Sequence, residues 1–169
     1  MEYEVETKIT QEEHFLLLTS HSTYINGSSI GEKLVKDGVT FDGLIWRICN
    51  KDGRLPELEG YEITNCHIEG SDLSHMNFKG ANFQGTVFKN CVLRDANFRG
   101  AQMEGCSFIN CSMLRVDFDG ASLRGSQFEN CDLRGISLEG TDFEGATFEK
   151  TNLDEILLNN GKGIFLFYN

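Results

Sequence analysis

Apolar residues recur at every fifth position through the middle of the chain. The stretch from Tyr61 to Glu155 divides without a slip into blocks of five that begin YEITN CHIEG SDLSH MNFKG ANFQG TVFKN. The middle residue of every block is Ile, Leu, Phe or Met, and the residue two before it is usually small. A period of five matches neither the period of about 3.6 of a helix nor that of about 2 of an uninterrupted strand. We therefore expect the chain to turn a corner once per block.

A second interval, of twenty residues, groups these blocks in fours. The letters FKNC at 88–91 return as FINC at 108–111 and FENC at 128–131. Four corners close one turn of a coil, so residues twenty apart should stack with strands about 4.8 Å apart. The middle positions agree, with columns of Ile68, Phe88, Phe108, Phe128 and Phe148, and of Leu73, Leu93, Met113, Leu133 and Leu153. The pattern predicts an all-β solenoid of about five coils.

The coil predicts the positions of the asparagine and the cysteine in FxNC. Glycine and asparagine tolerate positive φ, so Asn90, Asn110 and Asn130 are predicted at corners, as are the recurring glycines. Cys91, Cys111 and Cys131 fall in one inward column and are predicted to be small core residues. Stacked parallel thiols are poorly placed for a disulfide, and no His/Cys group has the spacing of a zinc site.

The blocks ANFQG, ANFRG, ASLRG and CDLRG resemble the A(D/N)Lxx unit of the pentapeptide-repeat family. This resemblance implies a right-handed quadrilateral β-helix. Several members of that family bind bacterial type II topoisomerases as acidic, rod-shaped mimics of duplex DNA and confer quinolone or toxin resistance. Other members have no known activity, so the resemblance specifies the fold more closely than the function.

The two ends of the chain lack the repeat. Residues 1–56 are predicted to form a small β-rich N-terminal cap, with hairpin turns at Asn26-Gly27 and Asp52-Gly53 and a capping box at Thr10 and Glu13 before a short helix. The β-helix is assigned to 57–158, and 159–169 form an apolar tail. A solenoid leaves its last coil open. The tail should therefore either fold back over that coil or, as we favour, form a homodimer contact through Ile164, Phe165, Leu166, Phe167 and Tyr168.

The chain is acidic, and the charge is uneven. Its formal net charge of −11 argues against a surface for nucleic acid phosphates. Residues 57–116 carry a net charge of −2, from seven acidic and five basic side chains, whereas 117–155 carry −7, from ten acidic and three basic. This acidity either serves solubility or forms a partner-binding surface. The candidates are Asp117, Asp119, Glu129, Asp132, Glu139, Asp142, Glu144, Glu149, Asp154 and Glu155.

No motif indicates catalysis. The sequence contains no GxSxG, HExxH or GxxxxGK[ST], and the recurring glycines follow the five-residue period of corners. We therefore predict that the protein is not an enzyme and needs no cofactor or metal. The polar, acidic start and the lack of an apolar run of roughly 18 residues predict a cytoplasmic protein without membrane contact.

Two functions remain open from the sequence. The first is a rigid structural or adaptor module that binds a protein partner within an assembly, favoured by the unbroken repeat and the distinct N-terminal segment. The second is a DNA-mimicking inhibitor or protector of DNA gyrase, another topoisomerase or a different DNA-binding enzyme. Arg124 and Arg134 interrupt the acidic stretch and weaken the second interpretation.

Overall fold

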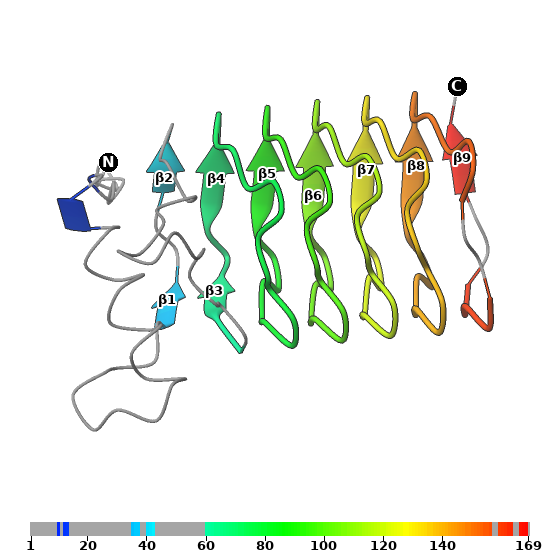
Figure 1. Ribbon diagram of the computed structural model, residues 1–169, viewed down its shortest axis with the longest axis horizontal. Helices are drawn as coiled ribbons and strands as arrows, with labels where there is room; N and C mark the ends of the chain where they lie inside the picture. Colours follow the sequence, from blue (N-terminus) through cyan, green and yellow to red (C-terminus); the bar gives the residue numbers. More distant parts are fainter. Residues whose placement is uncertain are drawn as a thin grey trace, which may run out of the picture.

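The protein is a parallel β-solenoid whose coils stack along one axis (Figure 1). The computed structural model describes residues 10, 12–13, 35–37, 40–42, 60–156, 159–163 and 166–168. Its strands are β1 (Val35–Asp37), β2 (Thr40–Asp42), β3 (Glu62–Thr64), β4 (His67–Glu69), β5 (Val87–Lys89), β6 (Ser107–Ile109), β7 (Gln127–Glu129), β8 (Thr147–Glu149) and β9 (Leu166–Tyr168). Every strand pairing described is parallel.

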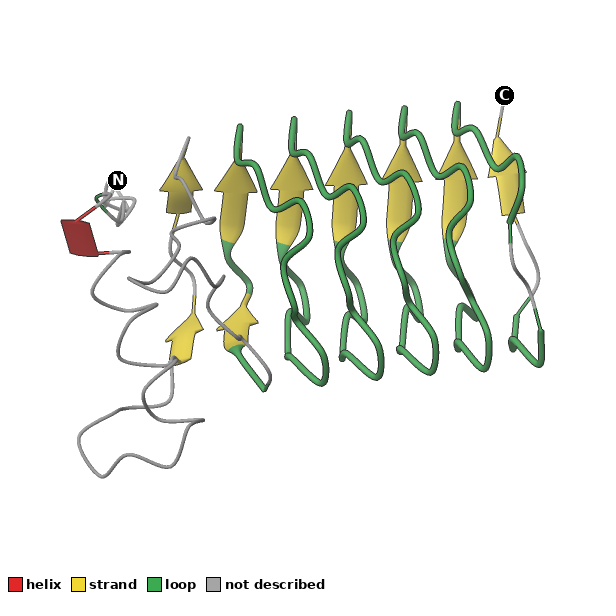
Figure 2. Ribbon diagram, in the orientation of Figure 1, coloured by secondary structure: helices red, strands yellow, loops and turns green. Residues whose placement is uncertain are grey.

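Each coil has four faces, as the interval of twenty predicts. Face A holds β4 to β8, in which Phe88 aligns with Phe108 and Phe108 with Phe128. Single bridges twenty residues apart join the other faces, which Figure 2 draws mostly as loops. We name these faces by their inward residues: face B by Leu73, Leu93, Met113, Leu133 and Leu153; face C by Phe78, Phe98, Phe118 and Leu138; face D by Ile63, Phe83, Met103, Leu123 and Phe143.

The described residues contain about four complete turns. We number them coil 1 (66–85), coil 2 (86–105), coil 3 (106–125) and coil 4 (126–145), and a fifth coil begins at residue 146. The sequence predicted about five coils, and the difference is this incompletely described last turn. The solenoid itself is confirmed.

Corners lie at every fifth residue, where φ is positive without exception from Gly60 to Asn160. At three of the four corners the chain closes a turn hydrogen bond, as between Ala101 N and Phe98 O at 3.0 Å. The asparagine column at Asn90, Asn110 and Asn130 has φ of 51° to 54°, which confirms its corner position. Non-glycine residues in this left-handed region are uncommon, so the corner position overrides local preference here.

The core is a stack of side chains on each face. The rings of Phe88, Phe108, Phe128 and Phe148 lie parallel with centroids 4.9 Å apart, close to the strand spacing. Large residues at the small position, such as Met76, Val116 and Ile136, are buried without interrupting the bridges of face C. The coil therefore tolerates a larger side chain at that position.

Strands from both ends extend the solenoid. β2 pairs with β4, aligning Phe41 with Ile68, and β1 pairs with β3. These intervals of 27 residues differ from the repeat, so the five-residue pattern did not reveal the added strands. The sheet of face A thus runs in the order β2-β4-β5-β6-β7-β8-β9.

At the C-terminal end, β9 runs parallel to β8 and aligns Phe167 with Phe148. β9 continues the coil in the same sense at the edge of β8, and the predicted fold-back of the tail over the last coil stays a prediction. The interval here is 19 residues, because one residue fewer separates Lys162 from Leu166 than separates Asp142 from Thr147. Pairing of the tail with a second chain stays a prediction, and Ile164 and Phe165 lie outside the described residues.

The capping box is confirmed. Thr10 Oγ1 accepts a hydrogen bond from Glu13 N at 3.2 Å, and Thr10 N donates to Glu13 Oε2 at 2.9 Å. Residues 12 and 13 are helical. The rest of the predicted helix and both predicted hairpin turns lie outside the described residues, and the domain boundaries stay predictions.

Candidate interaction surface

The ten predicted acidic residues do not lie on one face. Asp117, Asp119 and Glu139 lie on face C, Glu129 and Glu149 on face A, Asp142 and Glu144 on face D, and Asp132 and Asp154 on face B, with Glu155 at the corner that follows. The structure therefore distributes the negative charge around the rod.

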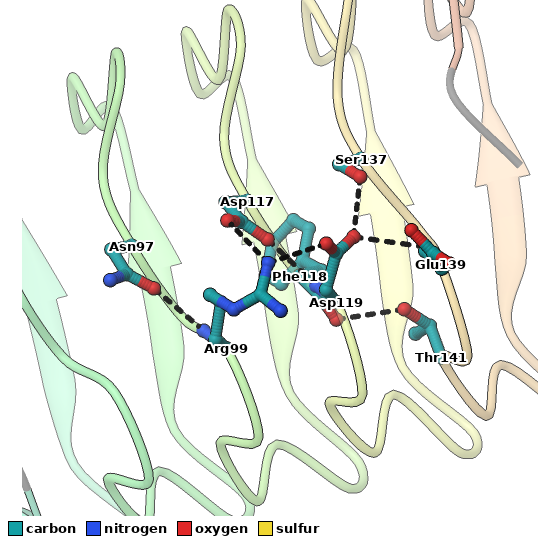
Figure 3. A network of polar contacts seen from close by, with 8 residues as sticks. All are labelled: Asn97, Arg99, Asp117, Phe118, Asp119, Ser137, Glu139 and Thr141. Carbon is teal, nitrogen blue, oxygen red and sulfur yellow. Dashed lines mark hydrogen bonds and ion pairs between the residues drawn. The ribbon is translucent and has the colours of Figure 1, made fainter.

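Arg99 holds two of these carboxylates on face C (Figure 3). Its Nη1 lies 2.6 Å from Asp119 Oδ2 and 3.3 Å from Asp117 Oδ2. Asp119 Oδ1 accepts further hydrogen bonds from Ser137 Oγ and from Glu139 N. The network spans coils 2 to 4 and leaves Asp119 largely buried, with 12% of its side chain exposed.

Four more of the predicted acids are paired on the other faces. Arg124 Nη1 lies 3.0 Å from Asp142 Oδ2 and 2.6 Å from Glu144 Oε2. The hydrogen bond from Glu144 N, followed by that from Arg124, lowers the pKa of Asp142. Arg134 lies 2.7 Å from Asp132 and lowers the pKa of that carboxyl, and Lys150 lies 2.7 Å from Glu149. Six of the ten acids are thus matched by a cation in the same chain.

An ion-pair ladder that the sequence analysis did not predict runs along the corner after face B. Arg115 Nε and Nη2 donate to Asp95 Oδ1 and Oδ2 at 2.7 and 2.9 Å, and His75 Nδ1 lies 3.6 Å from Asp95 Oδ2. The hydrogen bond from Arg115 lowers the pKa of Asp95. All three residues have positive φ, so charged side chains occupy corners that glycine would fit with less strain.

Within the described residues, no ion pair involves Glu129, Glu139, Asp154 or Glu155. All four are exposed. Arg94 is likewise exposed and lacks an ion pair in this part of the chain. Lys162 is also exposed and has no ion pair in the described part of the chain, so it joins these residues as a charge available to a partner.

The surface also carries apolar side chains on coils 2 and 3. Val92 on face B is 42% exposed, and Val87, Ile109 and Leu114 are half-buried. Together with Arg94 they form a surface that is less acidic than the rest of the rod. Apolar letters at outward positions of the blocks were the available signal for it.

The asparagines of FxNC form a hydrogen-bonded ladder. Asn110 Nδ2 donates to Asn90 Oδ1 at 3.2 Å, and Asn130 Nδ2 donates to Asn110 Oδ1 at 2.8 Å. Asn90 Nδ2 donates to Glu69 Oε1 at 3.2 Å. Asparagine thus supplies side-chain hydrogen bonds between coils as well as a tolerated corner.

The inward placement of the cysteines is confirmed, since Cys66, Cys91, Cys106, Cys111 and Cys131 are buried and free. Cys111 Sγ lies 3.4 Å from both Phe88 O and Ile109 O, and Cys131 Sγ lies 3.3 Å from both Phe108 O and Glu129 O. Each thiol thus has one carbonyl acceptor in the preceding coil and one in its own. Burial raises the pKa of Cys106 to about 12. These thiols act as small core residues with a weak donor.

The described residues contain neither a metal-binding cluster nor a membrane-spanning helix. No three His, Cys, Asp or Glu side chains there are arranged to hold a metal ion. In the same part of the chain, no helix has the length and apolar character needed to span a bilayer. His67 and His75 lie exposed on the outside of the coil.

The repeat matches two protein-family profiles. A profile described as a pentapeptide repeat region matches residues 81–158, and one described as pentapeptide repeats (8 copies) matches 63–95. No curated protein matches the chain.

Three solved structures are similar over part of their length. A pentapeptide repeat protein from the Arabidopsis thaliana thylakoid lumen is 34% identical, with 50% of this chain and 59% of that protein covered and a TM-score of 0.49. The cyanobacterial protein Rfr23 of Cyanothece 51142 is 16% identical, with coverage of 80% and 88% and a TM-score of 0.37. QnrB1, a plasmid-mediated fluoroquinolone resistance protein, is 16% identical, with coverage of 76% and 81% and a TM-score of 0.34.

The Arabidopsis match thus spans less than two thirds of that protein. The four-sided coil, its five-residue corners and both repeat profiles agree with one another. The chain belongs to the pentapeptide-repeat protein family.

Proposed function

We propose that the protein is a non-catalytic interaction module whose rod presents a protein partner with outward side chains at regular spacing. One observation carries this proposal: the outward charges are distributed over four faces and are mostly paired within the chain. A rigid solenoid with distinct faces suits the binding of another protein by shape and by a few available side chains.

The described faces differ in the charges that they leave available. Face A offers Glu129, face B offers Arg94 and Asp154, and face C offers Glu139. Face D offers Lys162 and carries Gln102 at an exposed position. Binding of a partner that recognises one face should therefore be lost when an exposed side chain of that face alone is replaced.

The test uses the full chain and four variants as bait in the same lysate. The variants are Glu129→Lys, Arg94→Glu, Glu139→Lys and Gln102→Arg, one per face, each checked for an unchanged melting temperature. We expect one variant to lose a captured partner that the wild type and the other three retain. Capture that all four variants share with the denatured protein would contradict the proposal.

A second candidate is the DNA mimic, which the net charge of −11 and the ten acids of 117–155 favour. In this case the carboxylates without an ion pair would replace phosphates: Glu129, Glu139, Asp154 and Glu155. The fluoroquinolone resistance of QnrB1 belongs to that protein. A topoisomerase is the first target to test because several pentapeptide-repeat proteins bind one.

Gyrase supercoiling in the presence of rising protein tests this candidate. Inhibition or protection should weaken with salt, because a phosphate-binding site is reached through charge. The same effect should be lost in the variant E129Q/E139Q/D154N/E155Q. An enzyme that responds to neither protein would exclude this target.

A further inference from the structure

The outward side chains of face B change in character along the rod. In coils 2 and 3 the outward positions of the face hold Val92, Arg94, Ser112 and Leu114, and in coils 4 and 5 they hold Asp132, Arg134, Asn152 and Asp154. Val92 is 42% exposed and is the one large apolar residue in the described part of the chain with so open a position. One half of this face thus has two apolar side chains and a positive charge, and the other half has a net negative charge, because Arg134 offsets only one of its two aspartates.

Two opposite charges on this face are left over after the ion pairs are formed. Arg94 directly follows the inward residue Leu93, and Asp154 directly follows Leu153. Both are exposed, and in the described residues neither forms an ion pair. Arg134 lies between them; it forms an ion pair with Asp132 at 2.7 Å, and its weaker attraction to Asp154 does not reach ion-pair distance. The two charges occupy the same column three coils apart, about 14 Å at the spacing of parallel strands.

A two-fold axis brings these charges together. Let the axis run along the strand direction, between two copies of face B and midway between coils 3 and 4. It exchanges coil 2 with coil 5 and coil 3 with coil 4, and it leaves each column opposite itself. Arg94 then faces Asp154 of the second copy, and the reciprocal contact follows by symmetry. Leu114 faces the aliphatic stem of Arg134, which can cover it.

We propose that face B is a self-association surface, on which a second copy of the chain packs face to face with its rod antiparallel. The contact contains two Arg94–Asp154 ion pairs per dimer and covers Val92 and Leu114. A single face over four coils is smaller than a standard interface. The dimer is therefore expected to be weak and sensitive to salt.

The one like-charge contact is already compensated. The same axis sets Asp95 opposite Glu155 of the second copy, and like charges in such a position repel. Asp95 accepts hydrogen bonds from Arg115 Nε at 2.7 Å and Nη2 at 2.9 Å, so its negative charge is already balanced within its own chain.

The other faces fit the same operation less well. On face C it sets the acidic Asp119 against Glu139 of the second copy. Faces A and D do bring opposite charges together, but those side chains already have partners in their own chain: Lys89 with Glu69, Glu149 with Lys150, and Arg124 with Glu144. Face B alone offers opposite charges that lack an ion pair in the described structure.

Analytical ultracentrifugation of the full chain over a wide concentration range, at low and high salt, tests the proposal. The wild type should dimerise reversibly, and both Arg94→Glu and Asp154→Arg should weaken self-association at least about tenfold, as for other close interfacial charge pairs. An equimolar mixture of the two variants should dimerise again, because both contacts of the mixed dimer regain opposite charges. Glu139→Arg on face C is the matched control and should leave the dimer unchanged.

Three outcomes would overturn the proposal. They are a wild type that stays monomeric at every concentration, a dimer as strong in Arg94→Glu as in the wild type, and a mixture of the two variants that stays monomeric. A dimer through the C-terminal tail would be as strong in Arg94→Glu as in the wild type. It would also sediment as a more elongated particle than a face-to-face dimer. The result is independent of the lysate and gyrase experiments, since neither uses self-association as its readout.

Discussion

The ring of Phe108 stacks on that of Phe128 with centroids 4.9 Å apart and planes inclined by 7°. The same relationship holds between Phe108 and Phe88, at 4.9 Å and 8°. Phe108 is fully buried in this stack, whereas the adjacent Ile109 is half-buried on the outside of the coil. Neighbouring residues of one strand therefore contribute very differently to stability.

Replacing Phe108 by alanine should lower the free energy of unfolding by about 3 to 5 kcal/mol, through lost burial and the cavity left between two rings. Ile109→Ala should cost no more than about 1 kcal/mol, because its side chain stays partly in water. Urea unfolding of both variants measures the difference. Equal costs would contradict the inward position of Phe108.

Asn110 separates two properties of the corner. Asn110→Gly keeps a residue that accepts φ of 54° but removes two ladder hydrogen bonds, whereas Asn110→Ala also places a Cβ-constrained residue in the left-handed region. The free energy of unfolding of Asn110→Ala should therefore be lower than that of Asn110→Gly by about 1 kcal/mol. If glycine is instead more stable than the wild type, the ladder contributes nothing measurable.

Thr86 and Thr151 are both the first residue of a block of five, but substitution by valine should affect stability differently at the two positions. Thr86 is fully buried, donates to Ile63 O at 2.8 Å and accepts from Cys66 N at 3.3 Å, so Thr86→Val should cost about 1 to 3 kcal/mol. The buried Oγ1 of Thr151 has no hydrogen-bond partner. Thr151→Val should be neutral or stabilise by up to about 1 kcal/mol. Thermal unfolding compares the pair, and a clear loss at Thr151 would show that its hydroxyl is satisfied in solution.

Stability should depend on pH through Asp95. Arg115 lowers the pKa of Asp95 in the folded state, so this pair stabilises the fold above the unfolded pKa of about 3.9. The contribution is lost as the pH falls through the lower folded pKa. The difference in unfolding free energy between wild type and Arg115→Gln should therefore be largest above about pH 5 and shrink in acid.

The control for this pH effect is the Asp95→Asn background, which removes the titrating carboxyl. There, Arg115→Gln should have the same effect at every pH. A pH-dependent difference that persists in this background would assign the titration to another group.

Gly163 should be essential to the last coil. A Cβ at this position would lie 2.6 Å from Phe143 Cδ2 and 2.8 Å from Phe143 C, and φ is 136°. Gly163→Ala should cost about 1 to 3 kcal/mol or more, because backbone atoms form part of the clash. It should also increase hydrogen exchange of the β9 amides. Gly140→Ala is the control, since the nearest atom to its Cβ is Gly120 N at 4.0 Å and only the corner strain is added.

The coil, its register and its core follow from the amino-acid pattern alone. A period of five with an inward residue at each centre leaves one way to bury the apolar side chains, so the repeat alone places Phe108 between Phe88 and Phe128. The corners followed for the same reason, since Asn90, Asn110 and Asn130 recur where φ must be positive. Family membership followed from the same blocks.

The pairing of the surface side chains and the strands added at both ends are visible only in the folded structure. Outward side chains are long and solvated, so their partners depend on rotamers and on the height of the next coil; Arg99 reaches Asp119 at 2.6 Å across one such step. Most of the predicted acidic surface was thereby shown to be paired within the chain. The strands β1, β2 and β9 follow intervals of 27 and 19 residues, and backbone hydrogen bonding to an open edge requires no repeated sequence to form them.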